Sequence, residues 1–338
     1  MALTKIHFEN FIVFDNITVH PVNGINVIIG KNGTGKTQLL KAIYADTGVS
    51  EGPDPAILLD CFKRGADRTR LFAAERKGPL TIELTDDAIS ADRATDVIVG
   101  PQQKGDDLDS REHLVRMTKF YGALRVVYIP VKDMLTHAKG LPVMAEKYRD
   151  FPFDRTLTDI IQKANRWTLK EPPEIALAIL PILEKLMDGQ VVIENEEFYI
   201  RKHDGRMVNF AVEAEGLKKI GLLWQLLMNE SITENSILLW DEPEANLNPE
   251  FLPDLVECLL ELSRHGVQIF VSTHNYIFAK YFDVRRRNED AVAYHALYLD
   301  HDAVQCETKA HFADLEHNAI MLTFNKLLEE VYDLQVGE

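Results

Sequence analysis

The chain has 338 residues, of which 46% are hydrophobic and 27% charged, so it can bury a substantial core and exceeds the usual single domain of about 100–200 residues. No segment approaches the roughly 18 apolar residues of a membrane span, and the N-terminal residues lack the apolar core of a signal peptide, so we expect a cytoplasmic protein. A net charge of −16 disfavours unassisted binding to nucleic acid, and three cysteines without metal-ligand or redox spacing disfavour a zinc or dithiol site.

The first elements are three short strands and a glycine-rich loop. Apolar patterning predicts strands over 3–8, 17–22 and 25–29, which we expect to form one N-terminal sheet. The third strand leads directly into GKNGTGKT, residues 30–37, and a helix over 38–44 follows. This strand–loop–helix setting is the one that a phosphate-binding loop requires.

The residues of this loop suit a nucleoside triphosphate, although the motif does not distinguish ATP from GTP. Glycines let the backbone wrap around phosphates, so that N–H groups and the positive end of the following helix face the anion. Lys36 supplies a charge for the β- and γ-phosphates, and the Thr37 hydroxyl is suited to Mg²⁺. The loop therefore predicts a nucleoside triphosphate and Mg²⁺ as cofactors, and the family resemblance described below implies that the nucleotide is ATP. The expected nucleotide contacts are Gly30, Lys31, Asn32, Gly33, Thr34, Gly35, Lys36, Thr37 and Gln38.

The middle of the chain mixes helices and strands. Helices are predicted over 56–74 and, with breaks at prolines, over 132–187. Strands are predicted over 79–84, 96–99, 124–129, 191–194, 197–202 and 207–212. The polar stretch 100–110 is expected to be a loop, and Asp204-Gly205 is a strong hairpin signal. Since the insertion 132–212 is too short and too proline-rich for a long coiled coil, we expect a compact helical and β-hairpin lobe.

In the last third of the chain, patterning again predicts alternating helices and strands. The expected helices are 217–228, 249–265 and 313–334, and the expected strands are 237–240, 267–272, 291–299 and 303–308.

Two adjacent carboxylates follow the apolar strand 237–240. Asp241 and Glu242 at the carboxyl end of a buried strand form the arrangement of a Walker B motif. We expect Asp241 to hold Mg²⁺ and Glu242 to polarise the attacking water. An acidic strand end that begins a turn at Pro243 is the alternative for the isolated pattern. The preceding phosphate loop favours the catalytic interpretation.

A histidine follows the next apolar strand, 267–272. Ligands of parallel sheets lie beyond the carboxyl ends of the strands, so we expect His274 to face the γ-phosphate. A histidine after a strand is more often structural, but the accompanying motifs favour a functional role. Lys36, Glu242 and His274 are therefore the expected catalytic residues.

These motifs resemble a known class of proteins. GKNGTGKT, LLWDEPEANLNP and VSTHN, in this order and spacing, resemble the ABC-type ATPase domain of the SMC, RecF and OLD-type ATPases, often grouped with the AAA family. FENFIVF, GINVIIG, YIPVKDMLTHAKGL and AEGLKKIGLLWQLL resemble more closely a group of small stand-alone bacterial ATPases of this class. The resemblance covers nearly the whole chain. It implies an α/β fold, an ABC-type P-loop NTPase head with a mixed sheet, flanking helices and the inserted lobe.

The resemblance also implies a domain division. We expect an N-terminal ATPase lobe over 1–130, the inserted helical and β-hairpin lobe over 131–212, and a C-terminal ATPase lobe over 213–338.

The resemblance further implies that two copies dimerise head to tail on ATP. Each nucleotide would then lie between one copy's phosphate loop and the other copy's signature motif. Ala214, Glu215 and Gly216 occupy the place of the signature, and residues 246–248 match the D-loop, which puts Asn248 near the nucleotide. The family's Q-loop falls on Lys132 and Asp133. Gln102 and Gln103 precede the strand and are weaker candidates.

Two positions depart from the family pattern. Relatives usually offer a serine hydroxyl in the signature, where this chain has Ala214, although the Gly216 backbone and the helix N-terminus can still bind phosphate. Ile12 stands where many relatives carry a basic residue, so one phosphate contact is expected to be missing.

Three functions follow from the resemblance and the residues. The first is an ATP hydrolase whose dimers, alone or in larger assemblies, regulate a separate effector such as a nuclease or toxin in bacterial antiviral defence or DNA maintenance. The second, motivated by Ala214, is a nucleotide-gated scaffold with little turnover. The third is a repair ATPase that binds DNA directly, which the net charge of −16 disfavours.

Two basic clusters admit two interpretations. Arg285-Arg286-Arg287 and the scatter Lys63, Arg64, Arg68 and Arg70 are either docking patches or solvated surface charge, and the second interpretation is favoured.

Overall fold

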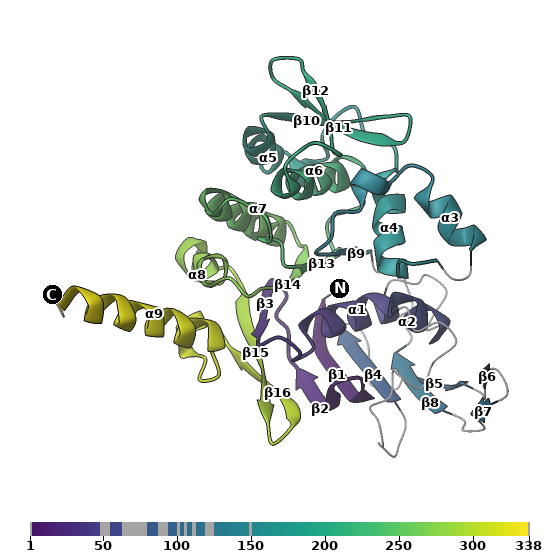
Figure 1. The fold of residues 1–338 in the computed structure, drawn as a ribbon, viewed down its shortest axis with the longest axis vertical. Coiled ribbons are helices and arrows are strands. Elements are labelled where there is room, and N and C mark those ends of the chain that lie inside the picture. The colour runs from purple at the N-terminus through teal and green to yellow at the C-terminus, as the bar shows by residue number, and fades with distance from the viewer. Residues whose placement is uncertain are drawn as a thin grey trace.

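A six-stranded sheet forms the centre of the molecule (Figure 1). The structure is a computed structural model that describes residues 2–47, 55–62, 80–86, 94–99, 102–104, 107–109, 113–118, 125–148 and 151–336. The strand order is β16–β15–β3–β14–β13–β9, and every neighbouring pair is parallel except β15 with β16. The bounds are β3 Ile25–Gly30, β9 Val126–Ile129, β13 Ile237–Asp241, β14 Gln268–Ser272, β15 Val292–Asp300 and β16 Ala303–Lys309. The parallel strands therefore end together at one edge, where ligands of such sheets bind.

Helices cover both faces of this sheet. Four strands of this sheet are buried along their whole length: β3, β9, β13 and β14. Alternate residues of a strand enter the cores on opposite faces of the sheet. In β13, Leu238 and Trp240 pack with α7 Leu252–Arg264 and α8 Tyr276–Arg285. Ile237 and Leu239 pack on the opposite face with α1 Lys36–Thr47 and α2 Pro55–Cys61. Burial on both faces explains why these strands are apolar runs rather than alternating patterns.

A second sheet lies beside the first, in the order β2–β1–β4–β8–β5. Its strands are β1 Leu3–Phe11, β2 Phe14–Val19, β4 Leu80–Asp86, β5 Ala94–Val99 and β8 His113–Thr118. The expectation that the strand at 25–29 joins the first two is wrong. That strand, β3, lies between β14 and β15, because its two apolar faces require a helix layer on each side.

The inserted lobe is helical with a three-stranded antiparallel sheet, as the patterning predicted. It contains α3 Leu141–Lys147, α4 Arg155–Ala164, α5 Leu180–Met187, β10 Gly189–Glu194, β11 Glu197–Lys202 and β12 Met207–Asn209. Gly205, with φ of +87°, makes the expected hairpin turn before β12. The following helix α6, Glu215–Met228, packs against α5 and β10. The domain division at residues 131 and 213 stays a proposal.

Several expectations differ from the structure. Helix α8, Tyr276–Arg285, was not predicted. The expected loop 100–110 contains two short paired strands, β6 Gln102–Lys104 and β7 Asp107–Asp109. The last helix, α9 Ala319–Val336, begins later than expected because a 3-10 turn at Phe312–Asp314 precedes it.

Of the two basic clusters, only Arg285-Arg286-Arg287 lies within the described residues. Arg286 is engaged within the chain, since it donates to the Ala310 carbonyl at 2.8 Å and lies 3.5 Å from the Asp283 carboxylate. Arg285 and Arg287 are exposed. The other cluster, Lys63, Arg64, Arg68 and Arg70, lies outside the described residues.

Helix α9 projects away from the body, and the C-terminus lies at its far end (Figure 1). Phe324 holds the base of the helix by stacking on Tyr276, with ring centroids 4.0 Å apart. Beyond this stack, large apolar side chains are exposed at Leu327, Leu328, Val331, Tyr332 and Leu334. Contiguous exposed apolar surface of this kind is typical of a protein contact. No helix within the described part of the chain is long and apolar enough to cross a membrane.

Gln268 gives a test of how the two sheets are joined. Its side chain, 1% exposed, accepts a hydrogen bond from Leu3 N at 2.8 Å and donates to the carbonyls of Leu3 at 2.8 Å and Val22 at 2.9 Å. Because Gln268→Leu leaves these backbone groups without partners, we expect a loss of about 3 kcal/mol in urea unfolding. Gln190→Leu, which removes one half-buried bond to Glu184, is the control and should cost less than about 1 kcal/mol. Equal losses in both variants would contradict the bridging role.

Candidate nucleotide-binding site

The loop between β3 and α1 depends on two glycines. Gly30 has φ of +152°, and a Cβ there would lie 2.4 Å from the Leu297 carbonyl oxygen. Gly35 has φ of +94°, and a Cβ there would lie 2.5 Å from the Phe14 ring. The turn between β1 and β2 therefore packs directly against the loop, and no larger residue fits at either position.

The Lys36 side chain folds back over the loop. Its Nζ donates to the carbonyls of Gly30 at 2.8 Å and Lys31 at 3.0 Å, and the Thr34 hydroxyl also donates to Lys31 O, at 2.9 Å. Burial lowers the pKa of Lys36 to about 8, and the nearby carboxylates of Glu242 and Asp241 oppose this shift. The ammonium is thus partly desolvated, which strengthens its attraction for an anion.

Asp241 connects the phosphate loop to the sheet. Its carboxylate, almost fully buried, accepts hydrogen bonds from the hydroxyls of Thr37 at 2.8 Å, Tyr128 at 3.3 Å and Ser272. These partners come from α1, β9 and β14. Burial and the neighbouring Asp241 raise the pKa of Tyr128, so its hydroxyl remains a donor. The two expected metal-binding residues, Thr37 and Asp241, are therefore in direct contact.

Glu242 is held in a left-handed backbone conformation, with φ of +47°. Its N–H donates to Ser272 O at 3.1 Å, and its carbonyl accepts a hydrogen bond from Lys219 Nζ at 2.8 Å. Such a conformation is costly for a residue with a side chain and persists only where surrounding bonds fix it. These two hydrogen bonds hold the backbone of Glu242, so that its carboxylate faces the loop with one third of the side chain exposed.

His274 faces Glu242 across the site, with Nε2 3.7 Å from Oε1 of the carboxylate. Burial and the Lys36 charge lower the pKa of His274, and both carboxylates of the Walker B motif oppose that shift. Glu244 fixes the backbone around His274, because its carboxylate accepts hydrogen bonds from the Thr273 hydroxyl and, at 3.4 Å, from the His274 N–H. Burial raises the pKa of Glu244.

These side chains enclose a cavity of about 290 Å³. Its lining consists of Asn32, Gly33, Gly35, Lys36, Thr37, Gln38, Glu242 and His274. Gln38, the residue after Thr37, has a buried Oε1 that finds no hydrogen-bond partner among the residues that the structure describes. Oxygen donors of this kind are the ligands that Mg²⁺ prefers, so the residues present fit a Mg²⁺–nucleotide complex. A neighbouring hollow of about 630 Å³ lies between Gly30, Lys31, His274 and α9.

The signature-like segment lies elsewhere. Ala214 and Glu215 are exposed at the N-terminus of α6, and neither lines the cavity of its own chain. Gly216 is buried, and a Cβ there would lie 2.7 Å from the Asn246 carbonyl oxygen. Asn248 is exposed and caps the next helical turn by accepting from Glu250 N at 3.1 Å. The expected roles of these residues across a dimer interface stay proposals.

The Q-loop candidates do not line the cavity either. Asp133 accepts a hydrogen bond from Leu135 N at 2.9 Å and lies 3.8 Å from Lys218 Nζ on α6, whereas Lys132 is exposed. Gln102 and Gln103 belong to β6. Ile12 forms the turn between β1 and β2 with φ of +47° and is partly buried against the N-terminal core.

Sequence reasoning missed the residues that hold the expected ones in place. Tyr128, Ser272 and Lys219 contact the Walker B motif from three separate elements. Ser272 lies opposite Asp241 in the parallel pairing of β13 with β14. Predicting that these two strands are parallel neighbours would therefore have identified Ser272 from the sequence. No local motif marks Tyr128 or Lys219.

Comparison with protein families decides the class of the chain. A family described as "AAA domain, putative AbiEii toxin, Type IV TA system" matches residues 69–279, which is more than half of the chain, and a second AAA-domain family matches residues 5–63. The chain belongs to the first AAA-domain family. Together with the fold and the curated relatives, this membership confirms the expected resemblance to ABC-type ATPases of the SMC and RecF class.

Relatives of this AAA-domain protein include DNA replication and repair proteins RecF. RecF of Ligilactobacillus salivarius is 26% identical over 214 residues, covering 59% of this chain and 52% of the relative. RecF of Shewanella woodyi is 48% identical over 44 residues, covering 13% and 12%. The chain thus matches about half or less of the length of these relatives.

Among solved structures, the Smc head domain of Pyrococcus furiosus, bound to the C-terminal domain of ScpA, has the same fold. It aligns with a TM-score of 0.51 at 12% identity and covers 98% of this chain and 99% of that one. The AAA-domain chain therefore has the fold of an SMC head.

The pKa of Lys36 predicts how nucleotide affinity depends on pH. Because a lysine with a pKa of about 8 loses its charge as pH rises through that value, ATP affinity should fall by up to about tenfold per pH unit above it. Lys36→Arg keeps a charged side chain throughout, and its affinity should vary less between pH 7 and pH 9.5. Titrations with a fluorescent ATP analogue measure both slopes. The same slope in both proteins would show that Lys36 is not the titrating group.

Proposed function

We propose that the chain binds and hydrolyses ATP, and that nucleotide-driven dimerisation regulates a partner effector. The contact between the Thr37 hydroxyl and the Asp241 carboxylate, 2.8 Å long, carries this proposal. It joins the phosphate loop to the Walker B strand, at a cavity that Lys36, Glu242 and His274 also line.

Each residue has a role that follows from its surroundings. Lys36 and the loop backbone bind the phosphates, and Thr37 and Asp241 hold Mg²⁺. When bound, Mg²⁺ neutralises phosphate charge and favours transfer of the terminal phosphoryl group. Glu242 orients the attacking water and accepts its proton, and His274, 3.7 Å away, contacts the γ-phosphate side of the site.

Dimerisation is supported by the residues left exposed. The N-terminus of α6, with Ala214 and Glu215, and the D-loop residue Asn248 face solvent and are available to a second copy. N–H groups at the start of α6 can bind phosphate. The solved Smc head neighbour is bound to ScpA, which supports a partner protein for this chain as well.

The effector is proposed to be a separate protein, such as a nuclease or toxin, in antiviral defence or DNA maintenance in the cytoplasm. The RecF relatives support the DNA-maintenance alternative, and the exposed apolar side chains of α9 support a protein partner.

Glu242→Gln is the direct test. Removing the proton acceptor should lower phosphate release by at least about a hundredfold, while ATP with Mg²⁺ should still convert the protein to a dimer. Light scattering and phosphate release measure the two effects. Glu234→Gln, an exposed position at the amino end of β13, is the matched control and should behave as the parent. A monomer that persists with ATP, in parent and Glu242→Gln alike, would contradict nucleotide-driven dimerisation.

A nucleotide-gated scaffold with little turnover is the second candidate, because Ala214 offers no hydroxyl at the signature position. Ala214→Ser should raise turnover and the ATP-dependent dimer fraction several-fold, and should also stabilise the chain by about 1 kcal/mol as a helix cap. Ala211→Ser in the preceding turn is the control. Greater stability without a change in turnover would assign the new hydroxyl to capping alone.

A DNA-repair ATPase is the third candidate, favoured by the RecF relatives and disfavoured by the net charge of −16. Salt-sensitive DNA binding in the presence of ATP would support it, and undetectable binding in moderate salt would remove it.

A further inference from the structure

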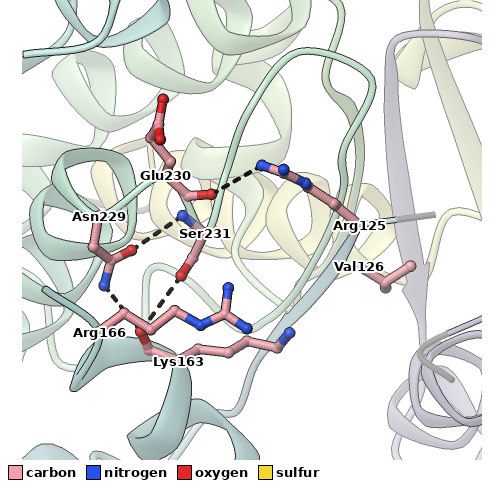
Figure 2. Close-up of a pocket in the computed structure, with 7 residues that line it drawn as sticks. All are labelled: Arg125, Val126, Lys163, Arg166, Asn229, Glu230 and Ser231. Carbon is pink, nitrogen blue, oxygen red and sulfur yellow. Dashed lines mark hydrogen bonds between the residues drawn. The ribbon is translucent and has the colours of Figure 1, made fainter. Parts of the chain in front are cut away.

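A second polar pocket, of about 380 Å³, lies away from the nucleotide-binding site (Figure 2). It is formed where α4 and α6 end and where β9 begins. Its lining consists of Arg125, Val126, Lys163, Arg166, Asn229, Glu230 and Ser231. The next residue after Arg166 is Trp167, which is 94% exposed.

The pocket and the nucleotide lie at opposite ends of the same strands. The Arg125 carbonyl accepts a hydrogen bond from Ile237 N, at the start of β13, with a length of 2.8 Å. Asp241 follows four residues later in the same strand, about 13 Å away at the usual rise of an extended chain. The two sites are therefore separate, although the sheet connects them.

Three cationic side chains converge on this pocket in a strongly acidic protein. Figure 2 shows the side chains of Lys163 and Arg166 extending side by side toward the strand of Arg125. Among the residues that the structure describes, no carboxylate forms an ion pair with any of the three. The Glu230 carboxylate points away from them, and only its carbonyl accepts a bond from Arg125, at 3.3 Å.

Within the described part of the chain, nearby acids compensate the charges of the pocket only in part. Burial and the neighbouring Arg166 lower the pKa of Lys163, and Asp159 only partly opposes this shift. The Asp159 carboxylate is itself engaged, by the Tyr44 hydroxyl at 2.7 Å and Arg155 Nε at 3.2 Å. Cations held together in this way are stabilised when an anion binds between them.

Helix capping does not account for Lys163 and Arg166, whereas Arg125 donates to the Glu230 carbonyl and the Thr233 hydroxyl, both at 3.3 Å, just beyond the end of α6. Basic side chains often neutralise the carbonyls at a helix C-terminus, and Lys163 lies in the last turn of α4. Here the carbonyl of Lys163 already accepts a hydrogen bond from Asn229 Nδ2 at 2.9 Å, and that of Ala164 accepts one from Gln225 Nε2 at 2.9 Å. The charged ends of Lys163 and Arg166 extend beyond these carbonyls into the pocket.

We propose that this pocket binds the phosphate group of a small phosphorylated molecule, or free phosphate. Arg125 directly precedes β9 of the sheet, whereas Lys163 lies in the last turn of α4 and Arg166 just after it, so the anion would tie the inserted lobe to the sheet. The hollow has the size of a small-ligand site. A nucleic acid would instead require basic side chains spread along a surface that follows its backbone, and the net charge of −16 opposes that.

Calorimetry with inorganic phosphate tests the proposal in a Lys36→Ala background, which removes the charged side chain that the phosphate loop would offer to the anion. We expect saturable binding at one site, weakened at least tenfold when Lys163→Gln and Arg166→Gln are added. Phosphate should also raise the thermal midpoint of the Lys36→Ala protein but not of the triple variant, because the anion joins two parts of the fold. Ribose 5-phosphate, compared with phosphate, distinguishes a phosphate ester from the free anion as the preferred ligand.

Lys147→Gln with Lys185→Gln, both exposed on helices of the same lobe, is the matched control and should leave phosphate binding unchanged. Circular dichroism verifies that each variant is folded. Phosphate binding that is absent, or equal in the triple variant, would overturn the proposal. So would short duplex DNA that binds through Lys163 and Arg166 when phosphate does not. Since the Lys36→Ala background is used, these outcomes are independent of ATP hydrolysis.

Discussion

The buried carboxylate of Asp241 is the contact on which the candidate site depends. Hydroxyls of Thr37, Tyr128 and Ser272, from the phosphate loop and the two strands beside β13, donate to it. A buried carboxylate is stable only when several donors surround it, so the loop, the Walker B strand and the neighbouring strands must keep one arrangement. The same carboxylate is the residue proposed to hold Mg²⁺. A metal there would share this carboxylate with the hydroxyls that fix it.

The first turn of α6 extends this constraint to the inserted lobe. Gly216 packs against the carbonyl of Asn246, Lys218 lies 3.8 Å from Asp133, and Lys219 donates to the carbonyl of Glu242 at 2.8 Å. One helical turn thus contacts the segment expected to be the D-loop, the Q-loop candidate Asp133 and the segment of the proposed catalytic residue Glu242. A rotation of α6 would alter all three contacts together, which would couple the proposed dimer interface to the proposed hydrolytic site.

Local chemistry made part of this structure predictable from the sequence. The phosphate loop and the Walker B motif are each a continuous stretch of sequence. The spacing of their glycines and carboxylates is therefore enough to recognise them. Strand neighbours are not encoded in this way: β3 was assigned to the wrong sheet because its apolar run fits any central position. Tyr128 and Lys219 reach Asp241 and Glu242 from distant parts of the chain, so only the fold reveals them. The basic pocket was missed for the same reason, since Arg125 is far in the sequence from Lys163 and Arg166.

The placement of tryptophan gives the two pockets different optical signals. The sequence contains three tryptophans. Trp240 is fully buried immediately before Asp241, and Trp224 is almost fully buried on α6. Trp167, directly after Arg166, is 94% exposed. Emission that iodide quenches therefore comes mainly from the end of the molecule with the basic pocket, and shielded emission comes from the sheet and α6. The unlabelled protein therefore carries a tryptophan next in sequence to a residue of each site, Trp167 after Arg166 and Trp240 before Asp241.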